Sequence, residues 1–431
     1  MGRHRFVTEG RRFDPREVIP DMSSFGRATI AGISGRVRFN RTMTTQKPEP
    51  TRGADARSRA VKLLYLVSED WYFISHRLPM ARAARDAGFE VHVATRVVDH
   101  AAAIEREGFI LHPLTWRRGN LSPLHLLFAA REVRGIYRQV QPTLAHHVAL
   151  LPALAGSLAA LGQPIICLNA LAGFGYAFAS VTFKARAVRF VLERLLRWLL
   201  GRDRAFVLVQ NVDDQAVILS LGVRADKIDL IAGSGVDTEM LLPLPEPPPP
   251  VAVGFVGRLL TDKGIRDLVA AHALLANRGK RVALLIAGEA DPANPASIPD
   301  KLLAEWTTHP NITLLGQVED VRTVWAKVHI AALPSLREGL PLSLLEAAAC
   351  GRPIVATDVP GCREIARPGI NALLVPPQDP VALADAIERL AADAGVRRRF
   401  AVAGRTLVES EFSQKRVGRE IVDLYKRLLQ R

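Results

Sequence analysis

The sequence predicts an α/β protein made of two doubly wound domains. Short, continuously apolar runs alternate with longer amphipathic segments from residue 61 onwards. Apolar runs of this kind suit strands buried on both faces, and a helix after each strand indicates a parallel sheet covered on both sides. The alternation stops at the proline-rich stretch LLPLPEPPPP and then restarts. A chain of 431 residues also exceeds what one core usually supports.

Each half of the chain supplies its own series of elements. The first series runs through the expected strands VKLLYLV, FEVHVAT, FILHPL, TLAHHV, PIICLNAL and AFVLVQ, with helices near 76–87, 99–107, 124–140, 150–161 and 181–200. The second series runs through VAVGFVGRL, RVALLIAGEA, NITLLGQ, HIAALPS, PIVATDV and NALLVPP, with a first helix near 264–278. The stretch from 380 to 430 is helical by its apolar period.

The expected domain limits follow from the breaks in this pattern. Residues 61–240 form the first predicted domain and residues 251–410 the second. Between them, the prolines of residues 241–250 remove backbone donors and favour a stiff extended linker. The last residues, 411–431, are expected to be a helix, for which a course back to the first domain is one option.

The basic charge is concentrated at the start of the chain. Residues 1–60 hold 13 Lys and Arg against 6 Asp and Glu, a net charge of +7, which is half of the total of +14. This leader has no sustained apolar period, so we expect it to be largely disordered, with Met43 as an alternative start. The charge indicates an anionic partner: nucleic acid, a phosphorylated ligand or an acidic membrane surface. Few aromatic residues accompany the basic ones in the leader, which disfavours a nucleic-acid binder.

Cysteine usage and apolar segment lengths bear on where the protein works. The three cysteines form no C-x-x-C pair or disulfide framework, as expected of a protein in a reducing cytoplasm. Residues 148–183 carry no charge, but prolines and an asparagine divide them into pieces of about 14 residues or fewer, too short to cross a bilayer. No transmembrane helix is predicted.

Two carboxylates flank the start of a clearly marked helix. Glu338 precedes Gly339-Leu340-Pro341 and the helix LSLLEAAAC, within which Glu346 lies about one and a half turns along. The free amides of a first helical turn, together with the helix dipole, can form a binding site for a diphosphate. Carboxylates accept hydrogen bonds from paired hydroxyls, so the two glutamates suit a ribose on one side and a sugar on the other. The alternative is a solvated Glu346 and a capping Glu338.

A second loop in the same predicted domain carries cations. In GFVGRLLTDKG, a strand ends at Gly257-Arg258 and the next helix opens near Lys263-Gly264. Glycine allows a ligand to approach the backbone. Arg can donate two parallel hydrogen bonds to a phosphate, and Lys supplies a compact positive charge. Two surface cations on an ordinary turn are the alternative interpretation.

Other candidate groups point away from dinucleotide and metal chemistry. The loop NALAGFGYAF has two glycines after a strand, but it lacks the third glycine and the acidic residue of a dinucleotide fingerprint. Histidines occur at strand ends, as His146 and His147, and at His76; His147 is the candidate for a hydrogen bond to a sugar hydroxyl, with a core role as the alternative. No cluster has metal-ligand spacing and no D-x-D occurs, so we expect neither a metal nor another cofactor.

One helix has the composition of a membrane-surface element. The segment TFKARAVRFVLERLLRWLLGRDR interleaves five basic residues at 184, 186, 189, 194 and 197 with apolar residues and Trp198. Such a helix suits contact with an anionic membrane surface, and a helix packed on the sheet with a charged outer face is the alternative.

Together these motifs resemble the retaining glycosyltransferases of family 4, whose GT-B architecture consists of two facing Rossmann-like domains. The resemblance is carried by Gly257-Arg258 with Lys263-Gly264, by the E-x7-E pair of Glu338 and Glu346, and by PIVATDVPGCREI and GINALLVPPQD. The segments SHRLPMARAARDAGFEVHVAT, HHV, GFGYAF, QNVDDQ and GSGVDT look like the branch that builds bacterial capsule, O-antigen and other lipid-linked glycans. The basic leader lies outside this pattern.

The resemblance implies a role for each of these residues. Arg258 and Lys263 would bind the diphosphate of a nucleotide-sugar donor, Glu346 the ribose, and Glu338 the transferring sugar. Glu289, after LLIAG, would lie near the base. The family often has His-x-His where this chain has adjacent histidines, so which of His146 and His147 would meet the sugar stays open.

The implied activity is a hexosyl or N-acetylhexosaminyl transfer with retention, independent of metal. The donor would be a UDP-sugar and the acceptor a polyprenyl-diphosphate-linked saccharide, with the protein peripheral on the inner face of the cytoplasmic membrane. A noncatalytic scaffold of the same fold is one alternative, although none of the charged positions is missing. A nucleotide-sugar epimerase or glucan phosphorylase of the same fold is another.

Overall fold

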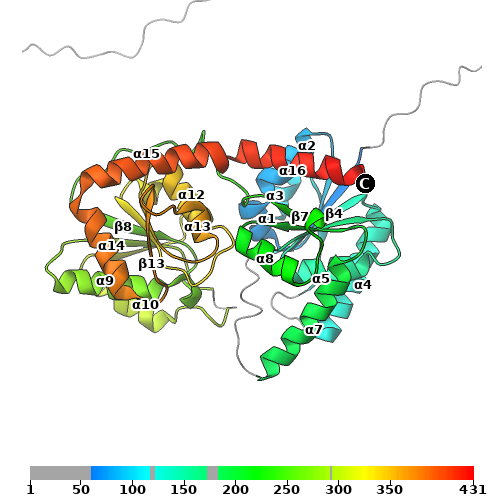
Figure 1. Cartoon of the computed structure of the whole chain (residues 1–431), viewed down its shortest axis with the longest axis horizontal. Coiled ribbons are helices and arrows are strands. Elements are labelled where there is room, and N and C mark those ends of the chain that lie inside the picture. The colour runs from blue at the N-terminus through cyan, green and yellow to red at the C-terminus, as the bar shows by residue number, and fades with distance from the viewer. Residues whose placement is uncertain (1–59, 117–121, 172–182, 292–293) are drawn as a thin grey trace, which may run out of the picture. The chain divides into compact units, whose positions relative to one another are not determined.

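The computed structural model describes residues 60–116, 122–171, 183–291 and 294–431, and for residues 183–188 the backbone alone. The described residues all belong to one compact unit. Within it, two parallel sheets are each covered by helices on both faces, so the predicted α/β fold class is confirmed (Figure 1). The leader, residues 1–59, and the glycine loop at 172–182 lie outside the described residues.

The first sheet has seven strands in the order β3-β2-β1-β4-β5-β6-β7, and all pairings are parallel. The strands are β1 (Lys62–Glu69), β2 (Glu90–Arg96), β3 (Ile110–Pro113), β4 (Leu144–Val148), β5 (Ile166–Ala170), β6 (Ala205–Val209) and β7 (Ile228–Leu230). The order reverses direction between β1 and β4. At such a switch point the loops diverge and leave room for a ligand beyond the carboxyl ends of the strands.

Helices cover both faces of this sheet. One face packs against α1 (Asp70–His76), α2 (Leu78–Asp86), α3 (Ala101–Arg106) and α16 (Gln414–Leu429). The other packs against α4 (Pro123–Val140), α5 (Leu150–Ala159) and α7 (Phe183–Leu200), while α8 (Val212–Ser220) follows β6. Among the described residues, no helix has the length and apolar character needed to cross a bilayer.

The first helical segment differs from the single helix expected at 76–87. The structure has two helices, which meet at Arg77, where the backbone leaves helical geometry (φ −127°). Pro79 explains the break, because proline fits the first turn of a new helix and cannot continue an old one. The first of the two helices therefore starts directly after β1 and brings residues 70–76 to the carboxyl edge of the sheet.

The second sheet has six strands in the order β10-β9-β8-β11-β12-β13, again all parallel. The strands are β8 (Ala252–Val256), β9 (Ala283–Ala287), β10 (Ile312–Gly316), β11 (Ile330–Leu333), β12 (Ile354–Thr357) and β13 (Ala372–Val375). The helices of this half are α9 (Ile265–Asn277), α10 (Asp300–Thr307), α11 (Arg322–Trp325), α12 (Leu342–Ala349), α13 (Cys362–Ile365) and α14 (Pro380–Ala392).

The chain passes between the two sheets twice. Residues 241–250 contain no helix or strand. Later, α15 (Ala394–Glu411) packs on α12, and the following α16 packs against α2 beside the first sheet (Figure 1). There the hydroxyl of Tyr425 lies 2.7 Å from that of Tyr65 and 2.6 Å from Nδ1 of His146, all buried. The last helix is thus part of the first core.

Candidate active site

A cavity of about 440 Å3 is lined by loops that follow the carboxyl ends of strands in both sheets. From the first sheet come residues that follow β1 and β6, and from the second come residues that follow β8 and β11. Seven predicted residues meet in its lining: Gly257, Arg258, Lys263, Glu338, Gly339, Leu340 and Glu346. Two loops that are 80 positions apart in the sequence therefore face the same space, as the alternation of strands and helices requires.

The amino end of α12 opens onto this cavity. Pro341 is its N-cap residue, and no side chain caps the first turn. Leu342 and Ser343, the first two helical residues, line the cavity. Amides in the first turn lack partners inside the helix, and the helix dipole adds positive potential. This end of the cavity can accept an anionic group.

Lys263 and Glu338 form an ion pair inside the cavity. The ammonium of Lys263 lies 2.6 Å from Oε1 of Glu338, whose side chain is 8% exposed. The same oxygen accepts a 2.7 Å hydrogen bond from the hydroxyl of Ser335, which is fully buried. Ser335 and Glu338 belong to the same loop, so this hydrogen bond fixes the carboxylate relative to its own backbone.

Arg258 is held on two sides. Its guanidinium lies 3.2 Å from a carboxylate oxygen of Asp291 and 5.7 Å from the ring centre of Trp71. A cation over the face of an indole is attracted by the ring's negative potential, and here the ring belongs to α1 of the first half. Asp291 of the second half and Trp71 of the first half therefore orient the side chain of this candidate phosphate-binding cation together.

Glycine is required behind this loop. Gly288 has φ +136°, and a Cβ at that position would lie 1.9 Å from the carbonyl oxygen of Gly257. Any larger residue would therefore move the backbone that carries Arg258.

Glu346 lies in the cavity lining without an ion pair in the described part of the chain. Burial raises the pKa of its carboxyl to about 8. The group is therefore largely neutral at pH 7 and able to donate or accept, and it becomes an acceptor of two hydroxyl hydrogens only when it ionises.

Two contacts join the Glu338 loop to the first half of the chain. Asn211 caps α8 by accepting from the amide of Asp214, and its side-chain amide donates to the carbonyl of Gly339 at 2.9 Å. Gly233 lies against Leu340, and a Cβ at Gly233 would come within 2.6 Å of that side chain. The loop is thus fixed from both halves.

Two of the predicted residues lie elsewhere. The structure places His147 in the core, fully buried, with Nε2 2.7 Å from the hydroxyl of Tyr137 and Nδ1 2.8 Å from the amide oxygen of Asn169. Both ring nitrogens are therefore occupied away from the cavity. Glu289 is exposed and outside the lining, and its backbone carbonyl accepts from the amide of Leu259.

The first half supplies cavity residues that sequence reasoning did not select. Trp71, Tyr72, Ser75 and Gln210 line the cavity, and so does His76, for which the sequence predicts no particular role. The signal that could have found them is their place directly after β1 and β6. Because open α/β sheets bind ligands at that edge, every polar residue after a strand deserved equal weight.

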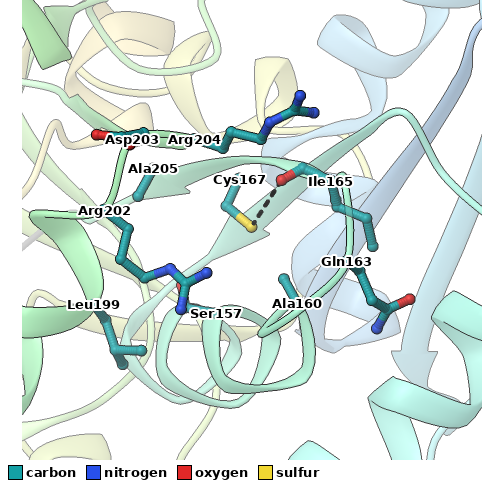
Figure 2. Close-up of a pocket in the computed structure, with 10 residues that line it drawn as sticks. All are labelled: Ser157, Ala160, Gln163, Ile165, Cys167, Leu199, Arg202, Asp203, Arg204 and Ala205. Carbon is teal, nitrogen blue, oxygen red and sulfur yellow. Dashed lines mark hydrogen bonds between the residues drawn. The ribbon is translucent and has the colours of Figure 1, made fainter.

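A second cavity, of about 410 Å3, lies at the opposite edge of the first sheet, at the amino ends of β5 and β6 (Figure 2). Its lining includes Arg202, Gln163 and Cys167. Burial raises the pKa of the Cys167 thiol to about 12, so the thiol stays protonated and is a poor nucleophile. None of the predicted site residues belongs to this cavity.

The predicted membrane helix is α7. Its described side chains include exposed Phe190, Val191 and Trp198, which are 57%, 65% and 53% exposed. Arg194 lies 4.9 Å from the ring centre of Phe190. The side chains at 184 and 186 lie outside the description. On α4, residues 124, 127 and 128 are also exposed and apolar.

Two family models together match most of the region from residue 62 to residue 393. Residues 62–210 match the family described as glycosyl transferase 4-like. Residues 250–393 match the family described as glycosyl transferases group 1. The two matches fall on the two sheets.

Curated relatives are named as glycosyltransferases. The chain is 30% identical over 177 residues to the capsular polysaccharide biosynthesis glycosyltransferase CapM of Staphylococcus aureus, a match that covers 41% of this chain but only 46% of that protein. It is 24% identical over 355 residues to the N,N'-diacetylbacillosaminyl-diphospho-undecaprenol alpha-1,3-N-acetylgalactosaminyltransferase of Campylobacter jejuni, covering 76% of this chain and 91% of that protein.

Solved structures show the same fold. Sucrose-phosphate synthase from Thermosynechococcus elongatus superimposes with a TM-score of 0.72 at 22% identity, covering 86% of this chain and 99% of the other. Anabaena HepE in complex with UDP and glucose gives a TM-score of 0.69 at 17% identity, covering 85% and 99%. The chain therefore belongs to the GT-B glycosyltransferases, with a glycosyl transferase 4-like domain followed by a group 1 domain.

Proposed function

We propose that this protein transfers a hexose or N-acetylhexosamine from a UDP-sugar to a polyprenyl-diphosphate-linked saccharide, with retention at the anomeric carbon. The observation that carries the proposal is the single cavity in which Arg258, Lys263 and the amino end of α12 meet Glu338 and Glu346. Cations and helix amides suit a diphosphate, and carboxylates suit the hydroxyls on either side of it.

Each predicted residue that lines the cavity then has a role in the proposed reaction. Arg258, Lys263 and the α12 amides bind the donor diphosphate, with Gly257, Gly339 and Leu340 letting it approach the backbone. Glu346 takes the ribose and Glu338 the transferring sugar. In the transition state, negative charge grows on the leaving diphosphate, and preorganised positive groups stabilise it in the place where other enzymes use a metal ion.

The proposed chemistry requires no cofactor. The acceptor oxygen forms a bond to the anomeric carbon as the bond from that carbon to the diphosphate oxygen breaks. The proton of the acceptor hydroxyl passes to the departing diphosphate. Attack on the face that the leaving group vacates gives retention. Full activity in excess EDTA is the expected result, and a loss that added Mg2+ restores would contradict this part of the proposal.

Two relatives support the choice of donor and acceptor. HepE has been solved in complex with UDP and glucose, and the Campylobacter relative is named for a diphospho-undecaprenol acceptor. The exposed apolar residues of α7, interleaved with arginines, support a place at an anionic membrane surface, which we propose to be the cytoplasmic face.

The proposal is tested by titrating the full-length protein with UDP and with a panel of UDP-sugars, followed by transfer to a short polyprenyl-diphosphate-linked N-acetylhexosamine. Binding of UDP and turnover of one donor are expected. Nuclear magnetic resonance of the product reports the anomeric configuration. Absence of binding to every nucleoside diphosphate sugar tested would leave the noncatalytic scaffold as the better account.

A further inference from the structure

His76 is a cavity residue with an orientation fixed by its neighbours. It ends α1 and lines the cavity on the side of the first sheet, together with Tyr72 and Ser75. Its ring stacks on Tyr72, with 4.3 Å between the ring centres and 5° between the planes. Nδ1 lies 2.6 Å from the hydroxyl oxygen of Ser75.

The hydrogen bonds of Ser75 determine which nitrogen of His76 carries the proton. The hydroxyl of Ser75 has one hydrogen, and it donates to the carbonyl of Trp71 at 2.8 Å. If that hydrogen pointed at His76 instead, two oxygen atoms would lie 2.8 Å apart with no hydrogen between them. Both short contacts are satisfied when Nδ1–H donates to Ser75. Nε2 is then an unprotonated acceptor.

Nothing in the described part of the chain occupies that acceptor. Nε2 makes no hydrogen bond to a described residue, whereas His147 uses both of its nitrogens in the core. Burial, together with the charges of Arg77, Lys263 and Arg258, lowers the pKa of His76 to about 3. The imidazole of the unliganded protein is therefore neutral at pH 7 and keeps its lone pair.

We propose that Nε2 of His76 accepts a hydrogen bond from a carbohydrate hydroxyl bound in the cavity. This inference rests on the proposed function and deepens it. The hydroxyl belongs either to the transferred sugar or to the attacking acceptor, since both must reach the same space. A neutral imidazole with a lowered pKa is a weak base, so we assign it no part in removing the acceptor's proton. Its contribution is to orient the hydroxyl while the diphosphate takes the proton.

The test compares His76→Ala, His76→Gln and Ser75→Ala with the wild type, and uses His309→Ala, an exposed histidine of the second half, as the matched control. Affinity is measured by calorimetry for UDP alone and for UDP-glucose and UDP-N-acetylgalactosamine. Hydrolysis without acceptor and transfer to a polyprenyl-diphosphate-linked N-acetylhexosamine are then measured for the donor that the wild type uses.

Affinity for UDP should stay within about twofold of the wild type in every variant, which shows that the fold is intact. If the hydroxyl is on the donor sugar, His76→Ala should lose about five- to tenfold in affinity for the nucleotide sugar. If it is on the acceptor, hydrolysis should be unchanged and transfer should fall by a similar factor. His76→Gln should recover part of either loss, because its amide oxygen can replace Nε2.

The tautomer has its own readout. Nitrogen-15 spectra of the histidine-labelled protein should show the His76 Nε2 resonance of an unprotonated nitrogen, and Ser75→Ala should shift it toward the mixed tautomer. A protonated Nε2 would overturn the inference. So would wild-type sugar affinity and transfer in both His76 variants. A wild type that binds no nucleotide sugar would instead refute the proposed function.

Discussion

The ammonium of Lys263 and the carboxylate of Glu338 lie 2.6 Å apart, so two residues assigned to opposite ends of the donor neutralise each other in the cavity. A diphosphate that binds Lys263 competes with Glu338 for the same charge. A sugar hydroxyl that donates to Glu338 would replace part of the stabilisation that Lys263 gives to the carboxylate. In the proposed reaction, the ion pair would therefore couple recognition of the sugar to recognition of the diphosphate.

This coupling gives opposite effects on binding and transfer in one variant. Glu338→Gln removes a negative charge beside the diphosphate and releases Lys263, so UDP should bind a few-fold more tightly. Transfer should fall by about 100-fold or more, because a neutral amide replaces the charged acceptor of the sugar hydroxyl. Calorimetry with UDP and a transfer assay measure the two effects. Weaker UDP binding in Glu338→Gln would show that the carboxylate does not compete.

Arg258 and Lys263 should contribute far more to the rate of transfer than other cations of the same domain. Lys263→Ala and Arg258→Ala should each reduce kcat/KM by about 100- to 1,000-fold, the range seen when a single oxyanion-stabilising group is removed. Lys280→Ala is the control, because Lys280 is an exposed lysine that pairs with Glu388 at 2.9 Å. Equal activities for Lys263→Ala and Lys280→Ala would remove Lys263 from the proposed site.

Donor affinity should depend on pH through Glu346. Its pKa is about 8 in the cavity, above the ordinary value of 4.5, because burial disfavours the charge. Two ribose hydroxyls that donate to the ionised carboxyl would lower that pKa in the complex. Binding at pH 7 then releases a proton, and affinity rises with pH until about 8. Calorimetry in two buffers of different ionisation enthalpy measures the release.

The control for this effect is Glu346→Gln, which cannot ionise. Its affinity should be lower at pH 8 and almost independent of pH between 6 and 9. The sign for stability is the reverse. A carboxyl whose pKa is raised by folding favours the folded state at low pH and loses that contribution as pH rises through 8. Proton uptake on binding would contradict the assignment of Glu346 to the ribose.

Gly288 should tolerate no side chain. In Gly288→Ala the new Cβ would meet the Gly257 carbonyl, displacing Arg258, and we expect a loss of more than about 3 kcal/mol in the free energy of unfolding. Gly279→Ala has a positive φ of +69° but nothing within 4 Å of its Cβ, so it should lose only about 1 kcal/mol. Denaturant titration compares the two. Equal losses would mean that backbone strain alone matters.

Removal of apolar side chains from α7 should weaken binding to anionic vesicles. The double variant Phe190→Ser with Trp198→Ser should lose about tenfold or more in affinity for vesicles that contain phosphatidylglycerol, because both side chains are exposed and apolar. Val402→Ser, an equally exposed change on α15, is the control. Sedimentation with vesicles measures the binding. Unchanged binding in the double variant would place the membrane contact elsewhere.

Short-range patterns in the sequence predicted the sheets and the second half of the cavity. Arg258, Lys263 and Glu338 lie on segments whose glycines and prolines mark where strands and helices meet, and Glu346 lies in the helix that follows the Glu338 loop. Parallel strands bring these segments to one edge of the sheet. His147 could not be placed in the same way. Adjacent residues of a strand point to opposite faces of the sheet. The groups that occupy the two nitrogens of His147, on Tyr137 and Asn169, belong to other elements, so the strand itself does not reveal them.

The helix that covers His146 shows why local patterns fail there. Tyr425, its hydrogen-bond partner, is 279 positions away in the sequence. The cavity residues of the first half were not predicted because of a local error in the start of one helix. The sequence predicts a helix that begins near residue 76, whereas α1 begins at Asp70 and brings Trp71 and Tyr72 to the cavity.

The return of α16 to the first core has a consequence for dividing the protein. A fragment cut at the proline-rich segment would lack the Tyr425 hydroxyl and the apolar side chains with which α16 covers Tyr65 and its neighbours. The amino-terminal fragment is therefore incomplete even though its seven strands are contiguous in sequence. We expect a separately supplied piece carrying residues 412–431 to complement it. The core of the first sheet is therefore built from both ends of the described chain, and the two sheets cannot be separated by a single cut without exposing it.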